Sequence, residues 1–195
     1  MPSHPIVLAS ASPARLRLLR DAGLDPAVVV SGVDETSVSP GTAAQQAEAL
    51  AVLKATSVAG RHPQAVVIGC DSLLAFAGEV YGKPANPVEA LSRWRAFRGR
   101  EGSLVTGHCV VVAGRVESAV AATAVRFGHP TDEELHSYVA SGEPLAVAGG
   151  FTLDGRSAPF LDGIDGDAGN VIGLSLPLLR SLLLRFDIGI TQLWR

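Results

Sequence analysis

The chain has 195 residues, and 16 Lys and Arg against 19 Asp and Glu give it a formal net charge of -3. Hydrophobic residues make up 47% of the chain and charged residues only 18%, which disfavours intrinsic disorder. No apolar run has the length of a membrane span, and a pI near 5.9 gives no broad basic surface for nucleic acid. We therefore expect one domain, or one with two lobes, and neither a membrane nor a nucleic acid as partner.

The cysteine pattern and the N-terminus point to an intracellular protein. Cys70 and Cys109 lie far apart and have no neighbouring CxxC or Cys/His cluster, so neither a zinc site nor a disulfide framework is expected. An apolar stretch precedes residues 9–11, which resemble a cleavage site, but the basic region of a signal peptide is missing. We interpret this segment as part of the fold of a cytoplasmic protein.

The start of the chain predicts a strand, a tight loop and a helix. The apolar run 5–9 has the composition of a buried strand. Ser12 then suits the N-cap of a helix, Pro13 its first position and Gly23 its end.

Apolar runs and helical patterns alternate in the next part of the chain. We expect, in order, a strand, a polar loop, a helix and a further buried strand at 27–31, 32–41, 42–59 and 65–70. This last strand is expected to end at Asp71, and a hairpin over 73–81 follows it. Asn86 and Pro87 then suit the start of a helix, with Glu89 completing a pattern similar to a capping box.

The second half of the chain is dominated at first by strand patterns. Residues 103–127 predict two long strands around the Ala-Gly pair at 113–114, and residues 131–142 predict a capped helix. The region 145–173 is rich in Gly and Asp, and an apolar helix opened by Pro177 closes the chain. This mixture predicts an α/β fold with a substantial antiparallel part.

A Ser-rich turn follows the first predicted strand and leads into a helix. The N-terminus of a helix offers backbone N–H groups and the positive end of its dipole to an anion. Ser10 and Ser12 add hydroxyl groups at this point, and Arg15 adds a positive charge. The turn therefore predicts a phosphate site, although serines in many such turns only cap the helix.

Asp71 follows a predicted central strand, the position at which open α/β sheets place ligands. The alternative is an aspartate that caps N–H groups of a turn. The D-x-D pair of aspartyl-phosphate phosphatases is missing, which disfavours a nucleophilic role for this carboxylate.

Lysine is rare in this chain, because 14 of its 16 basic residues are Arg and only Lys54 and Lys83 are Lys. An ammonium is a compact point charge, whereas a guanidinium is a wide planar fork. Each of these lysines is therefore either required by a tight site or present by chance. Lys83 lies between Gly and Pro, in a rigid loop that would present its ammonium to phosphates. Glu35 belongs to an acidic pair that either shares a metal such as Mg²⁺ with phosphate oxygens or forms a solvated loop.

The Gly/Asp-rich region 145–173 is too apolar for a disordered linker. Its glycines would let the backbone approach a flat ligand closely. Its acidic residues Asp162, Asp165 and Asp167 do not match the calcium-loop pattern and would also serve as turn formers. His108 belongs to no histidine cluster, and we expect it to be structural.

Several separated segments, taken together, carry a family resemblance. They are LASASPARLRLLRDAGL, VDE, KA at 54–55, VIGCDSLL, GKP, TGH, AGGFTLDG and DGIDGDAGNVIGLSLPLL. Read together, they closely resemble the Maf family of nucleoside triphosphate pyrophosphatases. The resemblance is collinear from about Ile6 to about Leu184 and so covers nearly the whole chain.

The resemblance implies a single domain over 1–195 with a Maf/inosine-triphosphatase-like fold, an elongated mixed sheet flanked by helices with a cleft between two lobes. It implies hydrolysis between the α- and β-phosphates of a nucleoside triphosphate, which yields the monophosphate and pyrophosphate. Asp71 matches the family's catalytic aspartate, the proton acceptor for water. The residues that match positions around the phosphates are Ser10, Ser12, Arg15, Lys54 and Lys83. Glu35 and Asp71 are the candidate ligands of a divalent metal, Mg²⁺ or Mn²⁺, and a homodimer is expected by family analogy.

Three positions bear on the choice of base. Ala14, Ser72 and Asp154 stand where the dTTP/UTP-preferring branch has Arg, Thr and Gln, and where the branch similar to 7-methyl-GTP pyrophosphatases has Trp, Gln and Glu. Only the acid at Asp154 agrees with the second branch. Because a carboxylate accepts hydrogen bonds from N–H donors such as those of a guanine edge, we expect purine triphosphates to be preferred.

Two functions of different class follow from this resemblance. The first is a house-cleaning hydrolase that removes non-standard or excess nucleotides. The alternative is a nucleotide-binding regulator of cell division with incidental turnover, since the family's name is tied to septum inhibition. Asp71, Glu35 and Lys83 favour the enzyme, because a pure binder has no need of a base beside a phosphate clamp.

Overall fold

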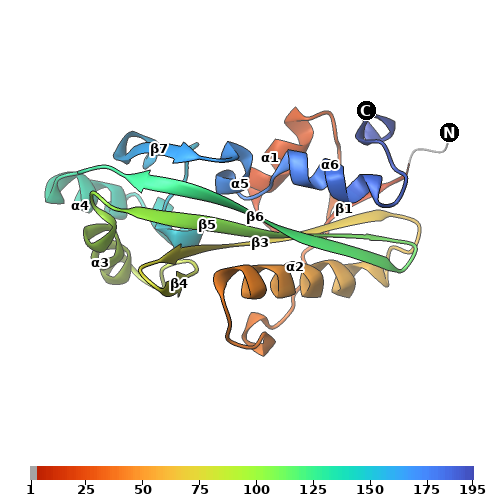
Figure 1. Cartoon of the computed structure of the whole chain (residues 1–195), viewed down its shortest axis with the longest axis horizontal. Coiled ribbons are helices and arrows are strands. Elements are labelled where there is room, and N and C mark those ends of the chain that lie inside the picture. Colours follow the sequence, from red (N-terminus) through yellow and green to blue (C-terminus); the bar gives the residue numbers. More distant parts are fainter. Residues whose placement is uncertain (1–3) are drawn as a thin grey trace. The chain divides into compact units, whose positions relative to one another are not determined.

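A computed structural model describes residues 4–195 and contains a seven-stranded sheet in the order β2-β1-β3-β5-β6-β7, with β4 paired to β3 (Figure 1). The strands are β1 (Ile6–Leu8), β2 (Ala27–Val28), β3 (Val66–Phe76), β4 (Glu79–Tyr81), β5 (Glu101–Val112), β6 (Arg115–Phe127) and β7 (Leu161–Asp165). β1 is parallel to β2 and β3, whereas the pairs β3–β4 and β6–β7 are antiparallel. The expected α/β fold with an antiparallel part is confirmed.

Helices flank this sheet, and side-chain caps begin several of them. The helices are α1 (Pro13–Asp21), α2 (Ala43–Ala59), α3 (Pro87–Phe97), α4 (Asp132–Ala140), α5 (Ala168–Ile172) and α6 (Leu176–Leu184). The side chains of Ser12, Asn86, Thr131 and Ser175 each accept a hydrogen bond from a backbone N–H in the first turn that follows, as expected for α1, α3 and α4 but not foreseen for α6. Within residues 4–195, no helix is both long and apolar enough to cross a membrane.

Two strands differ from their predicted limits. β2 pairs only through Ala27–Val28, and both residues are exposed at the edge of the sheet, so the strand expected at 27–31 is shorter. β3 does not end at Asp71 but continues to Phe76, because its last residues pair with β4 across a tight turn. The prediction of Asp71 at a strand's end is therefore wrong, and this residue lies within a long strand.

The Gly/Asp-rich region holds elements that the sequence did not predict. β7 pairs with β6, with Ala124 opposite Asp165. The short helix α5 follows directly after it. Alternation and helical periodicity are both hard to detect in segments of five residues that contain glycine, which explains the omission.

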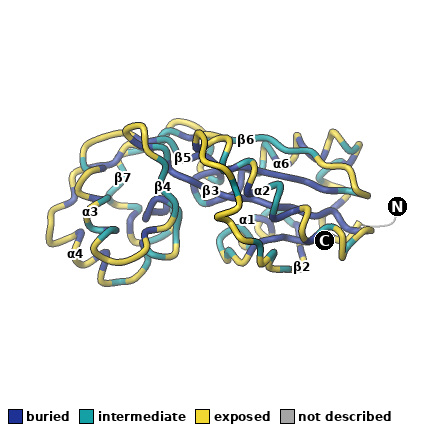
Figure 2. The backbone as a smooth tube through the Cα atoms, turned by 90° about the horizontal axis from the view of Figure 1, so that it is seen from below, coloured by how far each residue is buried: buried dark blue, intermediate teal, exposed yellow. Residues whose placement is uncertain are grey.

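The chain divides into two compact units. The first contains Met1–Asp71, Thr106–Ala121 and Gly173–Arg195, and the second contains Ser72–Val105 and Ala122–Ile172. Figure 2 shows β3 and β5 buried along most of their lengths. The single domain and the cleft implied by the family resemblance stay predictions.

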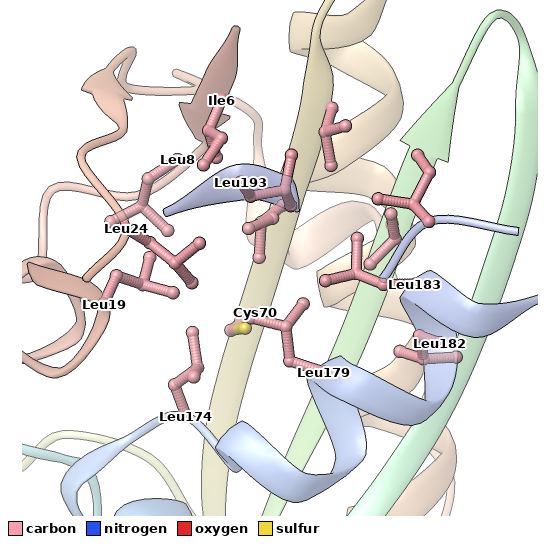
Figure 3. Close-up of a cluster of buried hydrophobic side chains, with 14 residues drawn as sticks. Ile6, Leu8, Leu19, Leu24, Cys70, Leu174, Leu179, Leu182, Leu183 and Leu193 are labelled. Carbon is pink, nitrogen blue, oxygen red and sulfur yellow. The ribbon is translucent and has the colours of Figure 1, made fainter. Parts of the chain in front are cut away.

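In the first unit, helices cover both faces of the sheet, with α2 on one face and α1 and α6 on the other (Figure 1). The side chains of Ile6 and Leu8 join the cluster beside α1 and α6, which Figure 3 shows in detail. Val7, between them in β1, joins the separate cluster against α2. Because successive side chains of a strand point to opposite faces, a strand covered on both faces reads as a continuous apolar run.

Helix α2 packs very closely on the sheet. A Cβ atom added to Gly69 of β3 would come within 2.5 Å of the carbonyl oxygen of Ala51, and one added to Gly107 of β5 within 2.1 Å of that of Ala47. The helix contributes small side chains to this interface, since Ala47, Ala51 and Ala55 are fully buried. The absence of side chains on both glycines lets the helix backbone lie against the strands, and α2 also carries one of the candidate site lysines.

The second unit has an aromatic core. Edge-to-face pairs join Trp94 to Phe127 and Tyr138, with ring centroids 5.6 and 5.5 Å apart. Trp94 Nε1–H and Tyr138 O–H both donate to the carbonyl oxygen of Gly150, at 2.8 and 3.1 Å. The aromatic core therefore fixes the backbone at the start of the predicted Gly-rich motif.

Candidate active site

The Ser-rich turn lies between β1 and α1, beside the first part of β3. The N–H of Ala9 donates to the carbonyl oxygen of Ile68 at 2.8 Å, which fixes the turn next to that strand. The hydroxyl oxygen of Ser10 accepts hydrogen bonds from the N–H of Ser12 at 3.2 Å and from Nη1 of Arg15 at 3.1 Å. Ser12 caps α1 by accepting the N–H of Arg15 at 3.4 Å. The structure thus brings the three predicted polar residues together at a helix N-terminus.

Arg15 is also held by a distant part of the chain. Its Nε–H donates to the carbonyl oxygen of Gly173 at 2.8 Å. Gly173 has φ of 130°, and a Cβ atom there would come within 3.3 Å of Arg15 Nε, so this contact requires glycine. No local sequence signal identifies this partner, although Gly173 lies within the motif NVIGLSLP.

His108 supports the same loop from the sheet. Its ring is fully buried, and its Nε2 accepts the N–H of Ser175 at 2.8 Å. Since Nε2 accepts, Nδ1 carries the proton and donates to the carbonyl oxygen of Thr106 at 3.0 Å. The expected structural role of His108 is confirmed, because it fixes the N-cap residue of α6.

A lysine and two carboxylates form the second cluster of the first unit. Lys54 Nζ donates to Asp71 Oδ1 and lies 2.7 Å from Glu35 Oε1. Lys54 and Asp71 are each only 9% exposed, whereas the Glu35 side chain is 57% exposed. The ammonium of Lys54 therefore bridges the two carboxylates that the sequence suggested as metal ligands. The close packing of α2 on β3 makes this bridge possible.

Cys70 lies next to both clusters. It is a free, fully buried cysteine among the leucines shown in Figure 3. Burial raises the pKa of its thiol to about 11, Arg15 and Lys54 oppose that rise through their positive charges, and Asp71 adds to it. The thiol is thus protonated and unreactive near neutral pH.

Lys83 belongs to the second unit, in the loop between β4 and α3. The residue is exposed, while Pro84 next to it is buried. The carbonyl oxygen of Gly82 accepts the N–H of Gly149 at 3.1 Å and Nη1–H of Arg93 at 2.6 Å. These contacts restrain the backbone directly before the lysine, as expected for a rigid loop.

The candidate specificity residues lie in three different settings. Asp154 is exposed, and its Oδ1 accepts the hydroxyl group of Thr152. The N–H and carbonyl groups of Thr152 both bond to the hydroxyl of Ser157, each at 2.8 Å, which closes a compact loop. Ser72 follows the buried aspartate on β3, and Ala14 lies in the first turn of α1, both half-buried.

The donor set was compared with the needs of a divalent metal. Within residues 4–195, no group of three or more His, Cys, Asp or Glu could hold a metal ion. Mg²⁺ commonly binds through one or two carboxylates together with substrate phosphates and water. Glu35 and Asp71 fit that mode in number, because they supply two carboxylates, and the Lys54 ammonium lies between them.

The fold and these clusters define the class of protein to which the chain belongs: mixed α/β proteins with a Ser/Arg turn at a helix N-terminus and a buried lysine–carboxylate pair. The model of a known family, described as Maf-like protein, matches residues 5–186. The chain belongs to the Maf family.

Close relatives of the chain carry the name nucleoside triphosphate pyrophosphatase. The relative from Streptomyces coelicolor is 63% identical and the one from Streptomyces avermitilis 61%, each over 99% of this chain and 96% of the relative. The relative from Salinispora tropica is 51% identical over 97% of this chain and 87% of its own length. The recognition made from the sequence motifs is confirmed.

Proposed function

We propose that this protein is a nucleoside triphosphate pyrophosphatase, a hydrolase that breaks the anhydride bond between the α- and β-phosphates. The names of its full-length relatives support this activity. The observation that carries it is the buried Asp71 carboxylate, which is paired with Lys54 and lies on the strand whose Ile68 carbonyl accepts the N–H of Ala9 in the Ser-rich turn.

Each group of the first unit has a part in this reaction. Ser10, Ser12 and Arg15 bind phosphate oxygens at the N-terminus of α1, where the helix dipole favours negative charge. Asp71 accepts a proton from water while the water oxygen bonds to phosphorus. The P–O bond that joins the α- and β-phosphates then breaks, and its electron pair stays on the bridging oxygen of the leaving group, so that the products are the nucleoside monophosphate and pyrophosphate. Lys54 holds Asp71 in place and balances its charge.

Glu35 and Asp71 are the residues that would hold a divalent cation, Mg²⁺ or Mn²⁺. When bound with the substrate, such a cation neutralises charge that develops on the phosphate oxygens. Glu35 is the more exposed of the two carboxylates, so it is open to a hydrated ion.

In the second unit, Lys83 and Asp154 are the residues proposed for phosphate contact and base recognition. The exposed Lys83 binds the phosphate chain from a restrained loop. Asp154, oriented by Thr152, accepts hydrogen bonds from the N–H donors of a purine base such as guanine. Ala14 leaves space that a large Arg or Trp would fill, and Ser72 is the third candidate specificity residue. Action on the cytoplasmic nucleotide pool, removal of non-standard nucleotides and a homodimer belong to this proposal through the family resemblance.

The test is pyrophosphate release from GTP, 7-methyl-GTP, dTTP, UTP and CTP, with separation of the products to identify the bond that breaks. We expect monophosphate and pyrophosphate, and higher kcat/KM for the guanine nucleotides. Asp154→Gln should reduce that preference, whereas Asp165→Asn, an exposed acid on β7, should not. Binding without turnover would favour the regulator of cell division. A preference for dTTP or UTP that is unchanged in Asp154→Gln would show that Asp154 does not read the base.

A further inference from the structure

Arg93 of α3 makes an unusual set of contacts in the second unit. Only 12% of its side chain is exposed. Its Nη1–H donates to the carbonyl oxygen of Gly82 at 2.6 Å, its Nη2–H bonds to Glu89, and its guanidinium carbon lies 5.0 Å from the ring centre of Tyr81. A planar guanidinium can donate in two directions and stack at the same time, which an ammonium cannot do.

Glu89 extends this set of contacts to the other side of the loop. Its Oε2 accepts the N–H of Ala85 at 2.7 Å, while its Oε1 faces Arg93. The bond from Ala85 is the main reason that the pKa of Glu89 is lowered, and the bond from Arg93 adds to it. The two side chains stand one helical turn apart on α3, the spacing that favours a Glu–Arg pair.

The Glu89–Arg93 pair thus forms hydrogen bonds with the backbone at both ends of the loop 82–85. Arg93 holds the carbonyl group before Lys83, and Glu89 holds the N–H group that follows Pro84. Lys83 remains exposed between these two anchors.

We propose that Arg93, with Glu89, is a positioning residue that aims Lys83 at the phosphate chain of the substrate. Fixing the loop backbone leaves only the lysine side chain to be ordered on binding, which lowers the entropic cost of the contact. Misplacement of a catalytic contact by about 1 Å can cost about 10²-fold in rate. This inference rests on the proposed function, in which Lys83 binds phosphate.

The test is a double-mutant cycle on the full chain, measured as kcat/KM for GTP with pyrophosphate release as the readout. The variants are Lys83→Met, Arg93→Met and the double variant. Arg95→Met is the matched control, since Arg95 lies on the same helix and pairs with Asp132 at the surface instead of with the loop. Thermal unfolding checks that each variant is folded, and Arg93→Lys replaces Arg93→Met in the cycle if the latter fails to fold.

We expect Arg93→Met to lower kcat/KM by about 10- to 100-fold, largely through KM, and Arg95→Met to leave it within about twofold. Arg93→Met should cause little further loss when Lys83 is already Met, because it acts through that lysine. Two outcomes would overturn the positioning role alone. In the first, Arg93→Met lowers kcat/KM equally in the wild type and in Lys83→Met. In the second, Lys83→Met is impaired while Arg93→Met has wild-type kinetics. Wild-type kinetics in Lys83→Met would instead show that Lys83 does not bind phosphate. The positioning role of Arg93 would then have no basis either.

Discussion

The site of Lys54 explains why this position has a lysine in a chain whose basic residues are mostly arginine. Its ammonium lies between two carboxylate groups and is almost fully buried. A guanidinium is wider and needs its donors arranged in a plane, so it would not occupy the same position without displacing Asp71 or Glu35. The lysine that the composition marked thus occupies a tight site.

Asp71→Asn should leave the protein folded and lower kcat by about 10²–10⁴-fold, the usual contribution of general-base catalysis. Asparagine keeps the shape of the side chain but cannot take a proton from water. Initial rates of pyrophosphate release, together with thermal unfolding, measure both effects. Asp25→Asn is the control, because Asp25 forms only an exposed pair with Arg20 in the same unit. Near-normal turnover in a folded Asp71→Asn variant would remove Asp71 from the catalytic role.

Lys83→Arg should be harmful even though the positive charge is kept. The loop backbone is held on both sides of the residue, so it cannot shift to accommodate a larger head group. We expect kcat/KM to fall by about tenfold or more, with no loss in thermal stability because the side chain is exposed. Wild-type kinetics in this variant would show that a positive charge alone suffices at this position.

At the scale of elements, the close packing of α2 on the sheet supports the site. Gly107→Ala would place a methyl group 2.1 Å from the carbonyl oxygen of Ala47, which forces the helix away from β5. Overpacking of this kind costs about 1–3 kcal/mol in the free energy of unfolding. Since α2 carries Lys54, the turnover of the folded variant should fall as well.

Gly60→Ala is the control for the overpacking expected in Gly107→Ala. Gly60 lies at the end of α2 with a right-handed helical backbone and open space around it. We therefore expect no loss of stability or activity from this alanine. Urea-induced unfolding of both variants compares the two sites, and equal stability of Gly107→Ala and the wild type would contradict the close approach of α2 to β5.

The contact between α3 and α4 predicts a dependence of stability on pH. Asp132 accepts hydrogen bonds from Arg98 and Arg95, at 2.6 and 2.7 Å, and these bonds lower its pKa below the ordinary value of 3.8. A carboxyl group with a lowered pKa in the folded state stabilises the protein above its ordinary pKa. That contribution is lost as the pH falls through the lowered value.

Asp132→Asn should therefore lower the Tm at pH 7 and have little effect once the pH is below the pKa of the folded state. Glu133→Gln is the control, since Glu133 is in the same helical turn and its loss affects the helix dipole equally. Thermal unfolding at several pH values makes the comparison. A Tm difference for Asp132→Asn that is independent of pH would show that the charge of Asp132 is not responsible.

At the scale of the whole molecule, activity should depend on a divalent cation. We expect a chelator to abolish pyrophosphate release and excess Mg²⁺ or Mn²⁺ to restore it, because the charge of the phosphate chain must be neutralised as the bond breaks. Glu35→Gln should raise the metal concentration needed for half-maximal rate, whereas Asp25→Asn should not. Full activity in thoroughly metal-free buffer would contradict this requirement.

Local sequence signals determined much of the fold. Ser12 and Asn86 cap their helices as expected, since an N-cap bonds only to residues a few positions away. The β5–β6 hairpin turns at Ala113 and Gly114, which have positive φ angles of 48° and 82°. That geometry also depends on two adjacent residues alone. The Ser-rich turn before α1 has the expected local geometry for the same reason, and its role in phosphate binding stays a prediction.

Only the tertiary structure decided how the site is assembled. Arg15 and Gly173 are 158 positions apart in the chain, and no local pattern encodes their hydrogen bond. Asp71 lies within β3 because a later strand extends the pairing, and Lys54 reaches it because glycines in two strands let α2 approach. Residue types and their neighbours along the chain therefore determine caps, turns and candidate groups. Packing between distant segments decides which of those groups meet, because it depends on the shapes of all the elements together.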